Sequence, residues 1–466
     1  MGFDVATATL SPPRPRGNLL TGHLAPMSRD PLGRLTGFAR EHGDVVGLRL
    51  LHLPALLVSH PDLIAQVLVT RSAQFVKSMD LRSTRMVLGD GLLTSEGDQW
   101  RRWRRLMQPA FHQECIATYC RAMTASAREI SSRWRDGETL ELRREMTGLT
   151  LRSATRALFG ADVADEEDRI GRAIDALCRL FDLSSAWVYL LPNYLPTPTH
   201  LRALAAIRRL DRVIARIVTS RRARGGAGDD LLGRILEAAE GENGRGSGIV
   251  RDQLMTLLIA GHETTSAALC WIWYLLSQHP EAEAQLHREL ETALGGREAR
   301  FEDLARLPYA GRVIDEALRL YPPAWLVGRE AAEDTQIGDY PVRRGTTVYM
   351  SQWVVQRDAR FFPEPERFHP DRWTQEFSRQ LPAFAYFPFG GGPRVCIGAA
   401  FAHTEAVLAL ATIAQQYRFT LVPGARVAPW PSVTLRPRHG LPVIAHRREP
   451  AKGSGGQAAG CSPITG

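Results

Sequence analysis

The sequence predicts a mainly α-helical protein with small β regions. Three observations lead to this class. Long runs with helical spacing of apolar residues fill most of 99–224, 249–294 and 308–321. Alternating segments bounded by turn residues are confined to 44–58, 325–355 and 418–443. A Pro-rich, irregular stretch covers residues 357–395.

Each element has a local reason. Pro54 is expected to break residues 44–58 into two short strands, and a short helix follows at 60–69. Pro322 and Pro323 end the helix at 308–321. Another helix follows Cys396. We expect a flexible segment at 1–18, one unit over 19–448, and a disordered, linker-like tail at 449–466.

The composition of the chain argues against several classes of function and location. The chain has 466 residues and a formal charge of +8, but no basic stripe interleaved with aromatics, so nucleic acid is not an expected partner. Six scattered cysteines suit a reducing compartment. The stretch from Leu254 to Leu276 has the length of a membrane span, yet His262 and Glu263 at its centre favour a buried core helix. The N-terminus lacks an apolar run typical of an anchor, and we expect a cytoplasmic protein.

Cys396 is the centre of the predicted chemistry. Glycines and a proline at 390–393 prevent a helix before it and an apolar run follows, so Cys396 falls near a helix N-terminus, which favours a thiolate. The nearest histidine, His403, gives no common zinc spacing, and Arg394 cannot serve as a base. A single thiolate beneath a flat cofactor fits haem iron. A buried helix-cap cysteine is the alternative.

The stretch from Phe389 to Gly398, F-G-G-G-P-R-V-C-I-G, resembles the haem-binding loop of the cytochrome P450 family, the haem-thiolate monooxygenases. The resemblance extends from about residue 20 to residue 445. It implies the cytochrome P450 fold, of the soluble bacterial type, around one haem b. It further implies that Cys396 is the iron ligand and that haem is contacted by Phe389, Gly392, Arg394 and Gly398.

The long helix at 249–278 carries A-G-H-E-T-T from Ala260 to Thr265. A glycine inside a helix costs up to about 1 kcal/mol relative to alanine, so we expect Gly261 to give a bound ligand close access to the backbone. Thr264 is spaced to bond the carbonyl of Ala260 and bend the helix. The resemblance makes Thr264 and Glu263 an alcohol–acid pair that delivers protons to dioxygen. Alone, the motif fits equally well a packing site with Glu263 facing solvent.

E-A-L-R, from Glu316 to Arg319, places opposite charges three residues apart on one helical face. Alone, this pattern is typical of a surface pair. The resemblance implies a buried pair joined by the arginine of a P-E-R-F motif, which stands at 365–368. We therefore expect Arg367 to complete a triad that supports the coil leading to Cys396.

Haem carries propionate groups, which need cations. Trp100 and Arg104 share a helical face, and the resemblance assigns both to the propionates together with Arg329 and Arg394. Arginine suits this task because its planar fork binds a carboxylate through two N–H groups. The neighbouring arginines of W-R-R-W-R-R are expected to be solvated or to contact a redox partner: Arg101, Arg102 and Arg105.

The substrate pocket is predicted from residues at positions expected to face the haem. They are Val87, Leu88, Val188, Ala260, Ala324, Trp325, Leu326, Val433 and Thr434. The set is apolar and partly aromatic, so the substrate is expected to be hydrophobic. Arg82 and Arg85 offer a carboxylate anchor, although solvated loop charges are the simpler interpretation.

The resemblance implies a monooxygenase that inserts one atom of O2 into a hydrophobic small molecule, by hydroxylation or epoxidation, in secondary metabolism such as terpenoid or polyketide tailoring. No reductase domain is expected within the chain, so NAD(P)H electrons would come through a ferredoxin reductase and a ferredoxin. We expect a monomer. The alternatives are a fatty-acid hydroxylase, a peroxide-driven haem-thiolate enzyme and a non-catalytic haem-binding protein. The presence of Thr264 and Glu263 argues against the last two.

Overall fold

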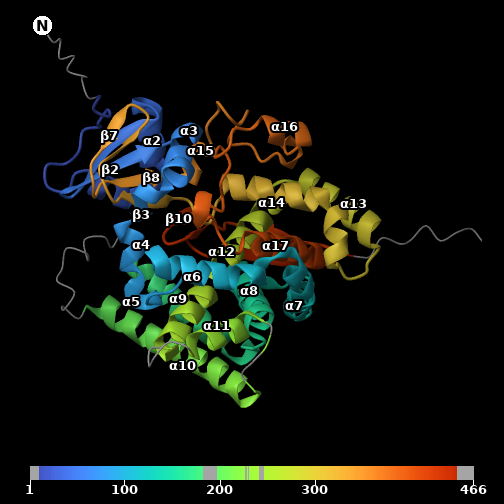
Figure 1. Cartoon of the computed structure of the whole chain (residues 1–466). Coiled ribbons are helices and arrows are strands. Elements are labelled where there is room, and N and C mark those ends of the chain that lie inside the picture. Colours follow the sequence, from blue (N-terminus) through green and yellow to red (C-terminus); the bar gives the residue numbers. More distant parts are fainter. Residues whose placement is uncertain (1–9, 182–196, 226–227, 229, 241–245, 449–466) are drawn as a thin grey trace, which may run out of the picture.

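The computed structural model describes residues 10–181, 197–225, 228, 230–240 and 246–448 (Figure 1). Helices make up most of this part of the chain, and a strand-rich region lies at one corner, as Figure 1 shows in blue and orange. The predicted class, mainly α with small β regions, is confirmed. The segments 1–9 and 449–466, and with them most of the predicted flexible ends, lie outside the described residues.

The α-helices of the described residues are spread over the whole length of the chain. Those of the first half are α1 (Leu24–Arg29), α2 (Pro31–His42), α3 (Pro61–Ala65), α4 (Met79–Ser83), α5 (Arg85–Leu88), α6 (Gly97–Met107), α7 (Gln113–Ser131), α8 (Leu142–Phe159), α9 (Glu167–Leu180) and α10 (Pro198–Ala223). Those of the second half are α11 (Leu231–Glu240), α12 (Gly246–Gln278), α13 (Pro280–Leu294), α14 (Pro308–Leu320), α15 (Gln352–Val355), α16 (Gln375–Gln380) and α17 (Ala399–Ala414).

The main sheet joins strands that are far apart in sequence. Its order is β1-β2-β8-β5-β3, formed by β1 (Val45–Leu50), β2 (Leu53–Val58), β3 (Phe75–Lys77), β5 (Val327–Ala331) and β8 (Thr347–Met350). The turn between β1 and β2 falls at 51–52, not at Pro54 as expected. Pro54 is accommodated because β8 pairs with β2 only from Ala55 onward, so no neighbour there requires its missing N–H.

Smaller strands complete the β structure. A three-stranded sheet has the order β4-β12-β9, formed by β4 (Thr139–Glu141), β9 (Tyr417–Leu421) and β12 (Pro442–Arg447). Two hairpins are formed by β6 (Thr335–Ile337) with β7 (Tyr340–Val342), and by β10 (Pro429–Pro431) with β11 (Leu435–Pro437). The last hairpin presents its tip, residues 432–434, toward elements of the site.

Helix α12 runs through the middle of the molecule, beside α17 in Figure 1, and packs against α8, α10, α11, α14 and α17. Its two tryptophans, Trp271 and Trp273, are buried, and Trp271 stacks on Tyr321 with ring centres 4.1 Å apart. The stretch from Leu254 to Leu276 lies within this helix and is mostly buried. None of the described helices combines the length and hydropathy needed to cross a membrane.

Part of the segment predicted to be flexible packs on the main sheet. The N–H of Gly47 in β1 donates to the carbonyl of Pro13, at 2.8 Å. The ring of His23 lies 3.0 Å from the carbonyl oxygen of Pro15. Residues 13–18 are therefore held against β1, because their carbonyls satisfy donors at the edge of the sheet.

Candidate active site

The loop before α17 is closed by backbone hydrogen bonds that fix Cys396. The N–H of Cys396 donates to the carbonyl of Phe389, and the N–H of Val395 donates to the carbonyl of Gly392, each at 3.0 Å. Gly392 has a φ of +66°, and a Cβ there would stand 1.7 Å from the carbonyl oxygen of Leu68. Only glycine fits at this point, so the role of Gly392 that the structure shows is to shape the cysteine loop.

Cys396 is exposed as a residue, and its thiol has two neighbours that stabilise the anion. Cys396 lies two residues before Gly398, the N-cap of α17. The surrounding protein raises the pKa of the thiol through desolvation, while the N–H of Gly398 and the charge of Arg104 act to lower it. The expected support for a thiolate is present, but desolvation outweighs it, so a cation bound to the sulfur would be needed to hold the anion.

Arg104 serves the cysteine loop directly. Its Nη1 donates to the carbonyl of Val395, the residue before Cys396, at 2.6 Å. Desolvation lowers the pKa of this guanidinium, and the charge of Cys396 acts in the opposite direction. This hydrogen bond of Arg104 ties α6 to the thiolate loop, and the propionate role that the family resemblance implied for Arg104 stays a prediction.

A group of charged side chains, here named the cation cluster, lies beside this loop. Its members are Lys77 of β3, Arg329 of β5 and Arg394 of η8 (Gly392–Arg394), gathered around the single carboxylate of Glu96. Arg394 donates to Glu96 at 2.8 Å. The Trp100 ring lies between two of the cations, with its centre 5.4 Å from the guanidinium carbon of Arg394 and 6.0 Å from Nζ of Lys77.

Thr264 lies on the exposed side of an otherwise buried helix. Its hydroxyl donates to the carbonyl of Ala260 at 3.0 Å, as the sequence predicted. Ala260 is exposed although it stands in the middle of α12. The face of α12 that carries Ala260 and Thr264 is therefore open to a ligand.

Gly261 lies on a different side of α12, toward α8. A Cβ added there would lie 3.7 Å from the Cβ of Ala154 in α8, an ordinary packing distance. The bare side of this glycine therefore faces the α8–α12 contact. The structure accounts for Gly261 as a helix-packing residue, and close access for a ligand stays a prediction.

Glu263 is neither exposed nor bonded to Thr264. Its carboxylate accepts a hydrogen bond of 2.9 Å from Thr434 and lies 3.3 Å from Nη1 of Arg436. Both alternatives considered from the sequence, a solvent-facing acid and an acid directed at dioxygen, differ from this docked position. The reason is tertiary: β11 and the residue before it bring an arginine and a hydroxyl against the middle of α12.

Comparison with known proteins agrees with this geometry. The family description "Cytochrome P450" matches residues 12–440. The chain belongs to the cytochrome P450 family.

Relatives of this P450 include characterised bacterial enzymes. It is 38% identical over 437 residues to cyclooctatin synthase of Streptomyces melanosporofaciens, covering 90% of this chain and 92% of that protein. It is 36% identical to pentalenene oxygenase of Streptomyces avermitilis, covering 88% and 91%. The crystal structure of the cytochrome P450DA heme domain superposes with a TM-score of 0.82 at 29% identity, covering 94% and 98%. The protein is a haem-thiolate monooxygenase, and its cofactor is haem.

The residues of this P450 fit a haem with two carboxylates. The cation cluster holds three positive charges and one negative charge, so it has an excess of two, equal to the charge of two propionates. Nε of Arg394 is buried without a hydrogen-bond partner among the described residues. Because a buried, unpaired donor is costly, this group calls for an acceptor. The donor set, guanidinium and ammonium, is the chemistry that binds carboxylates.

Two cluster residues were missed from the sequence, Lys77 and Glu96. Lys77 is one of only two lysines in a chain that otherwise uses arginine, and this was the available signal. Its Nζ donates to the carbonyls of Leu92 and Ser95, at 3.0 and 2.6 Å. Glu96 accepts from the backbone N–H of Lys77 at 2.6 Å. It therefore joins the strand that carries Lys77 to the loop that carries Arg394.

The predicted triad forms with a different arginine. Glu316 and Arg319 are fully buried and pair at 2.9 Å. The third cation is Arg372, 3.0 Å from Glu316, whereas the Arg367 side chain is exposed and pairs with Glu364. The prediction of Arg367 was wrong: P-E-R-F and P-D-R-W follow one another, and only the second places its arginine inward. Trp373 of that motif also donates to Glu316, at 3.0 Å.

The predicted pocket residues divide into two groups. Ala260 and Val433 are exposed, and Ala324 and Leu326 are partly exposed, as a pocket wall requires. Val87, Leu88, Trp325 and Thr434 are buried, so their assignment to the wall is not supported. Trp325 instead donates to the carbonyl of Ser432 and packs in a core beside the main sheet. Val188 lies outside the described residues.

The two arginines considered as carboxylate anchors are already paired. Arg82 bonds Glu330 at 2.6 Å. Arg85 bonds Asp90. Neither presents an unpaired charge to a substrate, so an acidic substrate has no support from them.

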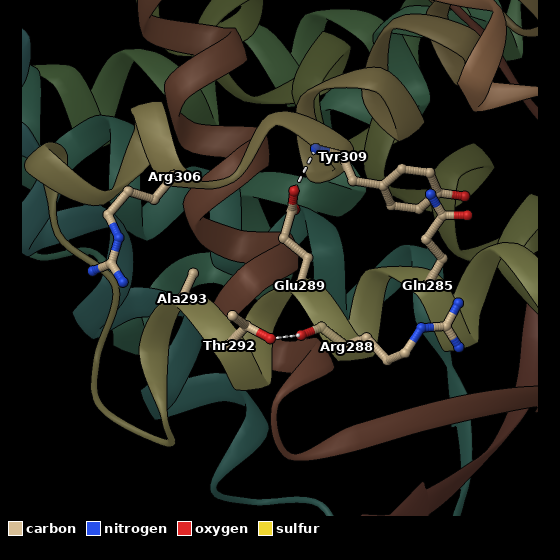
Figure 2. Close-up of a pocket in the computed structure, with 7 residues that line it drawn as sticks. All are labelled: Gln285, Arg288, Glu289, Thr292, Ala293, Arg306 and Tyr309. Atoms are coloured by element: carbon tan, nitrogen blue, oxygen red, sulfur yellow. Dashed lines mark hydrogen bonds between the residues drawn. The ribbon is translucent and has the colours of Figure 1, made fainter.

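A shallow surface depression of about 420 Å³ lies far from this chemistry, between α13, α14 and η6 (Phe301–Arg306). Figure 2 shows Glu289 in this depression directed at the backbone of Tyr309. Glu289 accepts from the N–H groups of Tyr309 and Ala310, at 2.6 and 2.9 Å, and so satisfies the first turn of α14. This depression has a structural explanation, and no predicted site residue lines it.

Proposed function

We propose that this P450 hydroxylates or epoxidises a hydrophobic terpenoid in secondary metabolism, using haem b. Cys396 would hold the iron, and Lys77, Trp100, Arg329 and Arg394 would hold the propionates. Electrons would reach the haem from a ferredoxin and its NAD(P)H-dependent reductase, and the enzyme would act as a cytoplasmic monomer. The exposed arginines of α6 support an acidic electron-transfer partner: Arg101, Arg102 and Arg105.

One arrangement carries the proposal. The thiol of Cys396, an exposed residue, is supported by the N–H of Gly398 and by Arg104, and it lies on a loop that also bears Arg394 of the cation cluster. A thiolate ligand and carboxylate-binding cations on one loop meet the needs of a haem ligated by cysteine. Arg104 reaches this loop from α6, which also carries Trp100 of the cluster.

When bound, a haem with a thiolate ligand supplies the oxygen activation and electron transfer that a protein side chain cannot. The chain's own residues supply proton positions. The Thr264 hydroxyl is fixed by its bond to the carbonyl of Ala260 and keeps its oxygen available as an acceptor on the exposed face of α12. Glu263 is the nearest acid in sequence, and it would serve this hydroxyl after leaving Thr434 and Arg436.

The substrate class follows from the relatives and from the exposed wall residues. Cyclooctat-9-en-7-ol 5-monooxygenase of Streptomyces melanosporofaciens, 37% identical over 414 residues, is named for an alkenol, and pentalenene oxygenase for an alkene. The exposed or partly exposed wall residues are apolar, including Ala260, Leu326 and Val433. An uncharged terpenoid fits such a surface better than a fatty acid, whose carboxylate would need a free cation.

The test has two steps. The purified, reduced protein should show the red-shifted thiolate-type absorption under carbon monoxide, and its absence would refute haem-thiolate binding. Alkenes and alkenols of the terpenoid class, including pentalenene and cyclooctat-9-en-7-ol, should then shift the Soret band, while fatty acids and macrolides should not. Turnover with a surrogate ferredoxin and NAD(P)H would complete the assignment. Turnover that peroxide alone supports would refute the proposed electron route.

A further inference from the structure

The cation cluster contains an unusual pair of neighbours. In the antiparallel pairing of β3 with β5, Lys77 stands directly opposite Arg329. Like charges at opposed positions of two strands destabilise a sheet. Both side chains are also buried, with exposed fractions of 4% for Lys77 and 8% for Arg329. The fold therefore places two cations on opposed strand positions where little water reaches them to screen their repulsion.

The neighbouring charges do not compensate this pair. Glu96, which is only partly buried, is the one carboxylate that acts on both of them among the described residues, and Arg394, at 2.8 Å, already binds it. Asp80 also acts on Arg329 but is exposed, so water screens it. The Trp100 ring, 6.0 Å from Nζ of Lys77, carries no charge. The cluster has an excess of two positive charges, and two of its three cations, Lys77 and Arg329, are buried.

Lys77 differs from the two arginines in its chemistry. An ammonium has three N–H donors, and the carbonyls of Leu92 and Ser95 take two of them. The third remains for another acceptor. Desolvation, with the charges of Arg394 and Arg329, lowers the pKa of Lys77 to about 8 against the effect of Glu96, whereas the pKa of Arg329 falls only to about 10. Lys77 is therefore the member of the cluster that loses its proton most readily, near pH 8.

We propose that the cation cluster is electrostatically strained without haem, that the two propionates relieve this strain, and that Lys77 both binds a propionate and couples haem binding to proton uptake. This inference rests on the proposed function, because it takes haem as the ligand. The repulsion lowers the stability of the haem-free chain, and it strengthens haem retention because the propionates relieve it. The same residue therefore acts in opposite directions on the two states.

The opposite effects of Lys77 on the stability of the haem-free chain and on haem retention can be tested. Lys77→Met removes the charge and keeps a long, unbranched side chain. We expect it to speed haem transfer from the full-length holoenzyme to excess apomyoglobin on the order of 10-fold, the loss typical of one charge-assisted hydrogen bond. We also expect its haem-free chain to unfold at a higher temperature than the wild-type haem-free chain. Lys77→Arg, which keeps the charge, should retain haem like the wild type.

A matched control removes a cation elsewhere. Arg209 is exposed on α10, far in sequence from the cluster, and Arg209→Met should change neither measurement. If Lys77→Met loses haem at the wild-type rate, or if its haem-free chain is less heat-stable, Lys77 only holds the loop that bears Leu92 and Ser95. Either result overturns the proposal.

Proton uptake on haem binding provides a second measurement, and it does not depend on comparing the heat stability of the variant with that of the wild type. Between about 8 and 10.5, the lowered and ordinary pKa of Lys77, haem binding should take up a proton at this residue. Ligation by Cys396 releases a proton in both proteins, so the quantity to compare is the difference between wild type and Lys77→Met. We expect about one proton per haem, by linkage. No difference would refute the coupling. Normal thiolate-type absorption in both proteins would show that the proposed function still holds.

Discussion

The hydroxyl of Thr434 donates a 2.9 Å hydrogen bond to the carboxylate of Glu263 and so docks the acid of α12 against β11. Arg436 assists from 3.3 Å, but it is closer to Asp175, at 2.8 Å, which Arg143 binds as well. Asp175 has a lowered pKa: desolvation would raise it, and the two arginines outweigh that effect. Because Arg436 keeps Asp175 as its partner, Glu263 can leave without creating an unpaired cation.

Thr434→Val should therefore destabilise the protein by about 1–3 kcal/mol, since it leaves a buried carboxylate oxygen with only the long contact to Arg436. Valine has nearly the shape of threonine, so packing changes little. Thr434→Ser keeps the donor and is the control. Chemical unfolding of the haem-loaded enzymes, followed by the Soret band, measures the effect. Equal stability of all three proteins would contradict the docking role.

Thr264→Ala should uncouple oxygen consumption from product formation, because the hydroxyl on the exposed face of α12 is lost. A proton-delivery group contributes a factor of about 10² to 10⁴ in rate, so the product formed per O2 should fall at least severalfold. Thr264→Ser retains the hydroxyl and should stay near the wild type. Unchanged coupling in the alanine variant would remove Thr264 from the proton route.

Cys396→Ser should abolish monooxygenation and the thiolate-type absorption under carbon monoxide, because a serine hydroxyl is a far weaker acid than a thiol and supplies no thiolate ligand. Cys115→Ser is the matched control, since Cys115 is a partly exposed free cysteine on α7. It should leave both properties unchanged. Turnover retained by Cys396→Ser would overturn the assignment of the iron ligand.

Arg372→Ala and Arg367→Ala separate the observed triad from the predicted one. Glu316 is fully buried, and removing Arg372 takes away one of its two cationic partners. Breaking a buried ion pair costs about 3–5 kcal/mol, so Arg372→Ala should strongly destabilise the fold or prevent haem loading. Arg367 is exposed, and Arg367→Ala should change the unfolding free energy by less than about 0.5 kcal/mol. The reverse order would restore the original prediction.

Glu405 predicts a pH dependence of stability. Burial raises its pKa from 4.5 to about 8, although the hydroxyls of Ser153 and Thr265 act to lower it. An acid with a raised folded pKa favours the folded state when protonated, so stability should fall as pH rises from about 4.5 to about 8. The slope is about 1.4 kcal/mol per pH unit for one group. Glu405→Gln should flatten the profile between those limits, and an unchanged profile would exclude Glu405 as its source.

Local features of the site were readable from the sequence. The spacing of Thr264 and Ala260 within one helix turn fixed their hydrogen bond, and the glycines before Cys396 fixed a non-helical loop. The pairing of Glu316 with Arg319 followed from their distance of three residues. Each depends on backbone geometry over a few residues, which local pattern specifies.

The errors concern partners far apart in the chain. The triad required a choice between Arg367 and Arg372, which stand in similar motifs five residues apart, and only the folded coil turns one inward. Glu263 and Arg436 are separated by most of the C-terminal half. With 58 basic residues to choose from, the sequence offers many chemically equivalent partners for any acid. Distance in space, not residue type, selects among them.

The sequence alone determined a mainly helical protein with Cys396 on a glycine-rich loop and Thr264 on a central helix, because these depend on local spacing, and the resemblance of its motifs to the cytochrome P450 family added the haem. The tertiary structure alone decided that Glu263 docks on β11, that Arg372 completes the buried triad, and that Lys77 faces Arg329 across two strands. The physical reason is that burial removes the screening of water, so the few charges that the fold brings together must balance one another.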